Sequence, residues 1–501
     1  MLLSSVKPAF AHGFGQRYDL PVPLSLWIAG GGAAVALSFV VLGLFMRGAA
    51  SGRGYPRLNV LRWASARCLV DTRLLFAVRL FSAGLAAVIV AAGAFGNQTP
   101  TRNLAPTAIW VMWWIGLAYA SALIGDVWAV VNPWSALFVW TEKLTGRGRR
   151  GSAALARYPA AAGMWPAIAL FTGFAWTELV FTGRAVPAQL AGIALGYSAL
   201  TWVAMLVFGR AVWLRHGDPF RGVFGLLARF APTEIRVTNP DICASCEVDC
   251  RDRRGECINC GECFSRAPHS ARELNLRPFG AGLLRGGRIS SSMAVFVLLV
   301  LSTITFDGFT ATPAWATIES ALYARLASLG DARLTIIDTL GLVAVPTVFA
   351  LVYGLFAAWT ARAAGRGYAV RDVAPAFVLS LIPIAIAYHL AHYFTYVLIQ
   401  GQLMIRLISD PFGFGWDLFG TASYRPDITI VGARLVWYGG VSAIVVGHIV
   451  AVYIAHVIAL REFGDRRAAL RSQYAMLVLM VGYTMVSLWI IAKPIVEGAR
   501  G

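Results

Sequence analysis

The chain has 501 residues, of which 58% are hydrophobic and 14% are charged. A soluble globular domain carries about a quarter charged residues, so this composition excludes an ordinary soluble protein and predicts a polytopic membrane protein. The net charge of +18 would suit nucleic-acid binding in a soluble protein. Here the arginines stand in short loops between apolar segments, which argues for the lipid bilayer, and against nucleic acid, as the partner.

Ten apolar segments follow one another along the chain. Each is long enough for the roughly 20 residues that a helix needs to cross the hydrocarbon core. The segments show no barrel-like alternation, so the predicted fold class is an all-α polytopic membrane protein with about ten transmembrane helices. The segments lie near 23–46, 74–96, 105–125, 160–181, 187–213, 290–308, 334–361, 373–399, 431–459 and 472–493.

Basic residues alternate between successive loops. The loops at 47–73, 143–157, 362–371 and 461–471 are rich in arginine, whereas Arg102 and Arg184 stand alone in theirs. The positive-inside rule then predicts a multi-pass protein of a bacterial-type cytoplasmic (inner) membrane, with both termini outside. The apolar part of the N-terminal segment is too short for a cleaved signal peptide.

This topology divides the chain into three parts. Residues 1–213 and 290–501 form two membrane halves of five helices each. Residues 214–289 form a small cytoplasmic insert, which carries six of the seven cysteines. Thiols are normally reduced in the cytoplasm, so the cluster indicates metal binding rather than disulfides. The six cysteines are Cys243, Cys246, Cys250, Cys257, Cys260 and Cys263.

The stretch "CINCGEC", which begins at Cys257, is followed by Pro268 at the distance found in C-x2-C-x2-C-x3-C-P. Over about 30 residues the region resembles bacterial ferredoxin-type 4Fe–4S motifs of membrane-bound iron–sulfur proteins. Ala267 stands where the fourth cysteine of that motif belongs. The resemblance implies one complete 4Fe–4S site and two remnant thiols, Cys243 and Cys246. Its implied ligands are Cys250, Cys257, Cys260 and Cys263, with Cys246 as an alternative fourth ligand.

A zinc ribbon is the alternative interpretation. Two C-x2-C pairs separated by ten residues supply four thiolates for a tetrahedral ion, namely Cys243, Cys246, Cys257 and Cys260. This hypothesis leaves Cys250 and Cys263 unused. A reduced loop that binds no metal is the remaining interpretation.

Four histidines stand inside predicted transmembrane segments and are candidate cofactor-binding residues. His389 and His392 share one face of the segment 373–399, and His448 and His456 lie in 431–459. Haem b held by imidazoles is one hypothesis, although the two pairs are offset by roughly 10–15 Å in depth. The alternative is that they hydrogen-bond to neighbouring helices.

Three acidic residues are expected at the same depth as His389 and His392. They are Glu178, Asp307 and Asp338. Together with the two histidines they predict a proton, metal or quinol pocket that opens outward, unless they mark ordinary helix ends.

Three functions remain compatible with these patterns. The favoured one is an integral membrane redox protein that passes electrons between a cytoplasmic 4Fe–4S cluster and a membrane haem or quinone, with a respiratory or cytochrome partner. The second is a transporter of a cation or small solute with a zinc-stabilised cytoplasmic loop. The third is an assembly factor for a respiratory complex.

Overall fold

The computed structural model describes residues 19–46, 54–145, 154–244, 246, 250–252, 255–285, 289–365, 367–463 and 465–493. Within these ranges nine helices are long and apolar enough to cross a membrane, which confirms the all-α polytopic class. Eight of these membrane-length helices correspond to one long α-helix each, in some cases with a short helical extension. These α-helices are α1 (Leu24–Phe45), α2 (Thr72–Phe95), α8 (Pro187–Phe208), α13 (Ser291–Thr310), α15 (Arg333–Ala364), α17 (Ile382–Gln400), α19 (Ala433–Glu462) and α20 (Arg466–Ala492). The ninth runs through α3 (Leu104–Pro106), a π-helical stretch (Thr107–Gly116) and α4 (Leu117–Leu123).

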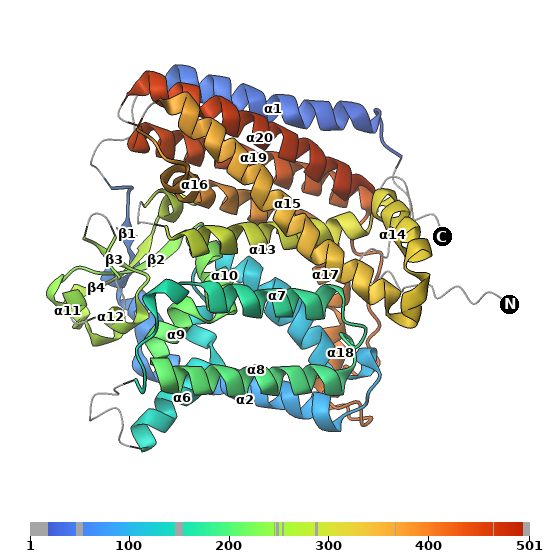
Figure 1. Cartoon of the computed structure of the whole chain (residues 1–501). Coiled ribbons are helices and arrows are strands. Elements are labelled where there is room, and N and C mark those ends of the chain that lie inside the picture. Colours follow the sequence, from blue (N-terminus) through green and yellow to red (C-terminus); the bar gives the residue numbers. More distant parts are fainter. Residues whose placement is uncertain are drawn as a thin grey trace.

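The long helices lie side by side along one common direction (Figure 1). α1 runs antiparallel to α20, because Gly31 lies against Leu488 and Gly43 against Leu470. α19 packs between α17 and α20, and α2 packs against α8. A small sheet sits at one end of the bundle, here called the insert end; α1 begins and α20 ends at the opposite, far end.

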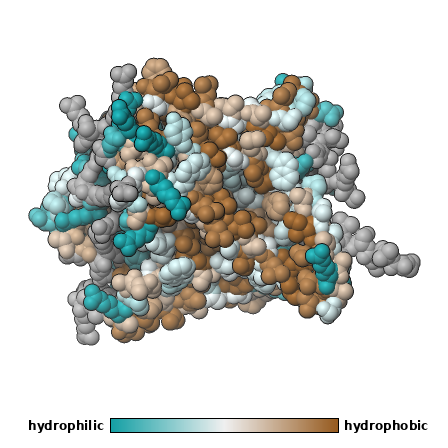
Figure 2. Space-filling model, turned by 45° about the horizontal axis from the view of Figure 1, so that its top comes forward, coloured by the Kyte–Doolittle hydropathy of each residue, from teal (hydrophilic) through white to brown (hydrophobic). Residues whose placement is uncertain are grey.

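Hydrophobic side chains form a broad band across the middle of the molecule, and hydrophilic side chains gather at the insert end (Figure 2). Many of the exposed apolar residues lie on α1, α2 and α15, whose outward faces have no neighbour among the described residues. Such a band would be an aggregation hazard in water, but it is what a bilayer requires of a helical protein.

The expected transmembrane segment 160–181 is shorter than predicted. Its helix, α7 (Trp165–Leu179), has 15 residues, which span only about 22 Å. The preceding chain turns at Gly163, which has a φ of +43°, and Pro166 stands in the first turn of the helix. α7 packs against α10 and α13. The chain before it meets the start of α13 at Ser292, and Glu178 near its C-terminal end lies by Asp307, so this short helix still leads from the insert end to the far end.

Shorter helices connect the long ones. They are α5 (Trp128–Val131), α6 (Pro133–Leu144), α9 (Arg210–His216), α10 (Pro219–Ala228), α11 (Asp241–Ala244), α12 (Gly261–Arg266), α14 (Pro313–Arg325), α16 (Val370–Val378) and α18 (Leu403–Ser409).

The insert is not purely helical, because it contributes three strands to a four-stranded antiparallel sheet. The strands are β1 (Leu58–Asn59), β2 (Thr233–Val237), β3 (Cys257–Ile258) and β4 (Arg272–Leu276), in the order β1-β4-β2-β3. β1 comes from the first loop of the chain and pairs with β4 more than 200 residues later. The sheet thus ties the first loop to the insert.

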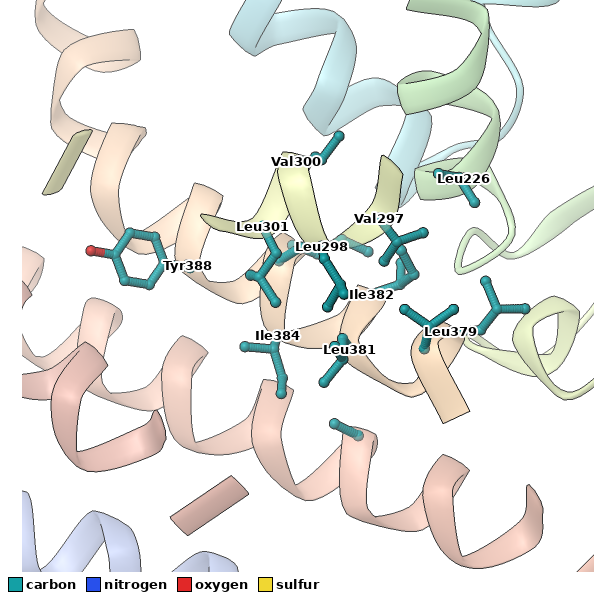
Figure 3. Packing of buried hydrophobic residues seen from close by; sticks show 14 of the residues in the cluster. Leu226, Val297, Leu298, Val300, Leu301, Leu379, Leu381, Ile382, Ile384 and Tyr388 are labelled. Atoms are coloured by element: carbon teal, nitrogen blue, oxygen red, sulfur yellow. The ribbon is translucent and has the colours of Figure 1, made fainter. Parts of the chain in front are cut away.

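Aliphatic side chains of α13 and α17 fill the middle of the bundle. Figure 3 shows Val297, Leu298 and Leu301 of α13 beside the segment 379–384, while the hydroxyl of Tyr388 points away from them. An added Cβ at Gly308 would overlap that hydroxyl. The glycine therefore lets the far ends of α13 and α17 approach closely.

The carboxylate of Glu234 on β2 is the centre of the contact between the insert and the rest of the protein. Its side chain is fully buried, and it accepts hydrogen bonds at 2.7 Å from Arg57 Nε and from Arg277 Nη1. Tyr55 also donates to it, and Arg285 Nη1 lies 3.8 Å away.

Arg277 extends this network into the helical part. Its remaining N–H groups donate to the carbonyl oxygens of Ala228, Arg229 and Ala231 at 3.1 Å, at the end of α10. The guanidinium is thus satisfied although it is almost fully buried, as a buried charge requires.

Replacing Glu234 by glutamine removes the carboxylate that pairs with the almost fully buried Arg277, whereas Arg57 and Arg285 still have Glu256 as a partner. Leaving a buried charge uncompensated costs about 3–5 kcal/mol, so we expect hydrogen exchange of the β2 and β4 amides to accelerate on the order of a hundred-fold. Mass spectrometry of the detergent-solubilised full-length protein measures this exchange.

Glu273→Gln is the matched control. Glu273 pairs with Arg236 at 3.2 Å, and both side chains are about a quarter exposed, so its loss costs only about 0–1 kcal/mol. Equal exchange in the two variants would contradict a central role for Glu234.

Candidate functional site

The six cysteines of the insert converge around the edge of the sheet. Cys257 opens β3, Cys260 caps the start of α12, Cys263 lies within α12 and Cys243 lies within α11. Cys246 and Cys250 lie between α11 and β3. The seventh cysteine, Cys68, is exposed in the first loop and stands apart.

A left-handed residue, Asn259, turns the chain between Cys257 and Cys260. Its φ is +53°, a conformation that asparagine tolerates better than most residues. Its N–H donates to the carbonyl of Ile235 at 2.9 Å, and its Oδ1 accepts from the N–H of Ile235 at 3.1 Å. β2 therefore fixes this turn, and both thiols face the same centre.

The sulfur atoms form two groups of four. Within each group all the Sγ atoms lie within 4.8 Å of one another. The first group is Cys243, Cys250, Cys257 and Cys263, and the second is Cys246, Cys250, Cys260 and Cys263. The Sγ atoms of Cys250 and Cys263 are 3.6 Å apart, and those of Cys246 and Cys260 are 3.8 Å apart. Either group can bind a metal ion.

Contacts between the thiols move their pKa values in opposite directions. The hydrogen bond with Cys257 lowers the pKa of the Cys260 thiol to about 5, and the same contact raises the pKa of Cys257. Burial raises the pKa of Cys250 to about 12 and also raises that of Cys263. At neutral pH the metal-free centre therefore holds the Cys260 thiolate beside protonated thiols, which a metal ion must deprotonate.

All six predicted metal ligands are thus brought together, but not in the predicted sets. Each of the two groups contains only three of the four residues proposed for a 4Fe–4S cluster. Each contains only two of the four residues proposed for a zinc ribbon. The sequence spacing did not indicate that Cys250 and Cys263 belong to both groups.

Of the predicted intramembrane residues, His392 and Asp307 meet directly. His392 Nε2 lies 2.8 Å from Asp307 Oδ2, and the hydroxyl of Tyr393 donates to the same oxygen at 2.6 Å. The sequence interpretation missed Tyr393, although a tyrosine beside a histidine within an apolar segment was a usable signal. We refer to Asp307, His392 and Tyr393 as the Asp307 site.

Further predicted residues surround the Asp307 site. Glu178 on α7 is close enough to Asp307 to interact with it electrostatically. The ring of His389 packs against those of Trp114, Tyr119 and Tyr393. Asp338 lies on α15 beside Thr339, whose hydroxyl accepts a hydrogen bond from Trp176 of α7 at 2.9 Å. Polar side chains thus lie together at the far ends of α7, α13, α15 and α17, which is the depth at which the sequence placed Glu178, Asp307, Asp338, His389 and His392.

His448 and His456 lie elsewhere, on α19. His448 Nδ1 is 2.8 Å from the carbonyl oxygen of Ile444, and His456 Nδ1 is 2.6 Å from Gln473 Oε1 of α20. The Nε2 atoms of both rings are buried and have no hydrogen-bond partner among the described residues.

The haem b hypothesis finds no support in this packing. An added Cβ at Gly447, the neighbour of His448, would overlap the Cβ of Ala387. α17 and α19 are therefore in direct contact at this level. Within the described ranges, no group of metal-ligand side chains includes a histidine of these helices.

Comparison of the chain with protein-family models, curated proteins and solved structures finds no match to any of them. The assignment of function therefore rests on the chemistry of these two sites.

Metal binding at the cysteine centre should depend steeply on pH. Because Cys250, Cys257 and Cys263 have raised pKa values, zinc must displace their protons. We expect the affinity for zinc to fall by about ten-fold per pH unit, or more, for each proton released as the pH drops from 8 to 6. Competition with a chromophoric chelator measures this affinity, and a pH-independent affinity would show that zinc binds elsewhere.

Proposed function

We propose that this chain is a membrane transport protein that binds a proton or a cation at the Asp307 site, and that its cysteine centre is a structural metal–thiolate module. The observation that carries the proposal is a carboxylate within an apolar helix bundle that accepts hydrogen bonds from an imidazole and a phenol. Ionisable side chains inside a membrane are costly, so they mark ion or proton pathways by default.

The burial of the site supports this function. The side chain of His392 is only 4% exposed, whereas that of Asp307 is 20% exposed, so the carboxylate is the group that an arriving ion can reach. A cation at Asp307 would compete with a proton shared between the carboxylate and His392. Exchange of the bound proton for a cation is the elementary step of coupled cation transport.

The distribution of arginine supports an orientation for this site. If the positive-inside rule holds, the insert end faces the cytoplasm and the far end faces outward in a bacterial-type inner membrane. Asp307 is three residues from the last residue of α13, near that far end. The site would then load from outside.

The distances between the sulfurs support a structural module rather than an electron carrier. In a 4Fe–4S cubane each cysteine binds a different iron atom, so its four sulfurs are spread wider than four that share one ion. Four thiolates around one zinc, with bonds of about 2.3 Å, have their sulfurs about 3.8 Å apart. The observed separations of 3.6 and 3.8 Å match this second arrangement.

The transport proposal predicts a specific loss of function on changing Asp307. In proteoliposomes that contain a pH-sensitive dye, we expect an imposed potassium potential or a sodium gradient to drive a flux of protons. Asp307→Asn should abolish this flux, because the amide cannot exchange a proton. Tyr393→Phe should weaken cation binding ten-fold to a hundred-fold, since a hydrogen bond to a charged group is worth about 1.5–3 kcal/mol.

Asp331→Asn is the matched control, because Asp331 is an exposed acid just before α15. Its flux should equal that of the unaltered protein. A flux that survives in Asp307→Asn would remove the Asp307 site from the pathway.

A redox protein is the second candidate, and one specific contact favours it. Gly280 of the insert lies beside Ile454 of α19, where an added Cβ would be 3.6 Å from its Cδ1 atom. The insert therefore reaches α19 within one turn of His456, whose Nε2 is unpartnered. Electrons from a cluster in the insert could pass to a haem or quinone near this end of the helix, and a respiratory partner would supply or remove them.

Anaerobic purification distinguishes the two candidates. A colourless protein that contains zinc favours transport. A brown protein that contains iron and acid-labile sulfide, or one with a Soret band, favours the redox function.

A further inference from the structure

The two four-sulfur groups of the insert are not independent. Cys250 and Cys263 belong to both groups. Cys243 and Cys257 belong only to the first group, and Cys246 and Cys260 belong only to the second. In geometric terms, two tetrahedra of sulfur atoms share one edge. That edge is the 3.6 Å separation between Cys250 and Cys263.

We propose that the insert holds two metal ions in a binuclear centre of six thiolates, with Cys250 and Cys263 as bridging ligands. This inference rests on the structural metal–thiolate module of the proposed function. The first ion takes Cys243 and Cys257 as its terminal ligands, and the second takes Cys246 and Cys260. Each ion then has four thiolates, which is the coordination that a structural zinc site requires.

A count of ligands favours two ions over one. A single ion in either group leaves two cysteines of the cluster without metal, although the six sulfurs form one continuous set of contacts. Two ions that share an edge use all six sulfurs. The shared pair also explains why neither of the sets expected from the spacing appears as a compact group.

The surroundings suit such a centre. Cys263 is fully buried in the small core of the insert, beside Val237, Ala267 and Ala271. Ala267 is 1% exposed, and it occupies the position at which the ferredoxin motif has its fourth cysteine. This apolar wall directs the thiols toward one another rather than toward a wider cluster.

Two divalent ions and six thiolates carry a net charge of −2, and arginines lie nearby to balance it. Arg221 of α10 interacts electrostatically with Cys260 while it pairs with Asp126 at 2.5 Å. Arg272 donates through Nε to the carbonyl of Ala267 at 2.7 Å and through Nη2 to that of Ser265 at 2.9 Å. Positive charge thus reaches the centre from both the bundle and the insert.

The two ions differ in their exposure. All the sulfur atoms of the first group are buried, whereas those of Cys246 and Cys260 in the second group are half-buried. A chelator should therefore remove the second ion first and leave a protein with one ion.

The test measures metal in the purified full-length protein after growth with zinc. We expect two zinc ions per chain and no acid-labile sulfide. One ion per chain would overturn the binuclear centre while leaving the structural module intact. Absence of bound metal would overturn both the binuclear centre and the structural metal–thiolate module. Four iron atoms with four sulfides per chain would also overturn both and would favour the redox candidate.

Cobalt substitution tests the shared ligands directly. Two high-spin cobalt ions that share thiolates couple antiferromagnetically, so fully loaded protein should give far less EPR intensity per cobalt than an isolated site. Full intensity at two cobalt ions per chain would overturn the bridging role of Cys250 and Cys263. This measurement needs no altered protein.

Alanine variants then assign each ligand. Cys246→Ala should retain one ion per chain and recover full EPR intensity per cobalt, because the remaining ion has no partner. Cys263→Ala removes a ligand from both ions and should lower the zinc content further than Cys246→Ala does. Cys68→Ala, at the exposed thiol outside the centre, should retain two ions. Two ions retained in Cys263→Ala would contradict the proposal.

Discussion

The buried carboxylate of Glu234 is the interaction on which the insert depends. Arg57 of the first loop, Arg277 after β4 and Arg285 near the start of α13 all converge on it. None of these cations is stable at such depth without a countercharge, and Arg57 and Glu234 are distant in sequence from each other and from the two other arginines. A two-residue strand such as β1 would not pair stably by itself. The ion pairs of Glu234 therefore stabilise the pairing of β1 with β4, and the sheet in turn positions the residues of these ion pairs.

The cysteine centre lies next to this sheet and its ion-pair network, in a part of the insert with a small hydrophobic core. The core around the cysteines consists, among the described residues, of a few side chains, mostly cysteine and alanine, with Val237 as its large buried aliphatic member, whereas the apolar side chains of α10 belong to the core of the bundle. A core of this size cannot offset the loss of chain entropy, and small domains of this kind rely on metal ions. The turn at Asn259 and the cap of α12 at Cys260 present the thiols, while the bound ions would supply the missing stability.

The sequence predicted the helices well for a physical reason that does not apply to the insert. In lipid the backbone must satisfy itself within each segment, so length and apolarity suffice to locate helices such as α1 or α20. The segment 160–181 is helical only over Trp165–Leu179, because Gly163 turns the chain before the helix and Pro166 stands in its first turn. In the insert, spacing predicted which cysteines come together but not which sulfurs meet. That depends on how α11 and α12 cross the sheet edge, and on a β1–β4 pairing that no local pattern encodes.

The two sites are joined by α13. The helix begins at Ser291, directly after the insert, and carries Asp307 near its opposite end, so about 24 Å of continuous helix separates the end of the insert from Asp307. α13 also packs against α15 and α17, which supply Asp338 and His392. A displacement of the insert end would therefore move Asp307 relative to the imidazole and phenol that hold it. The same helix that follows the cysteine-rich insert thus carries the intramembrane carboxylate.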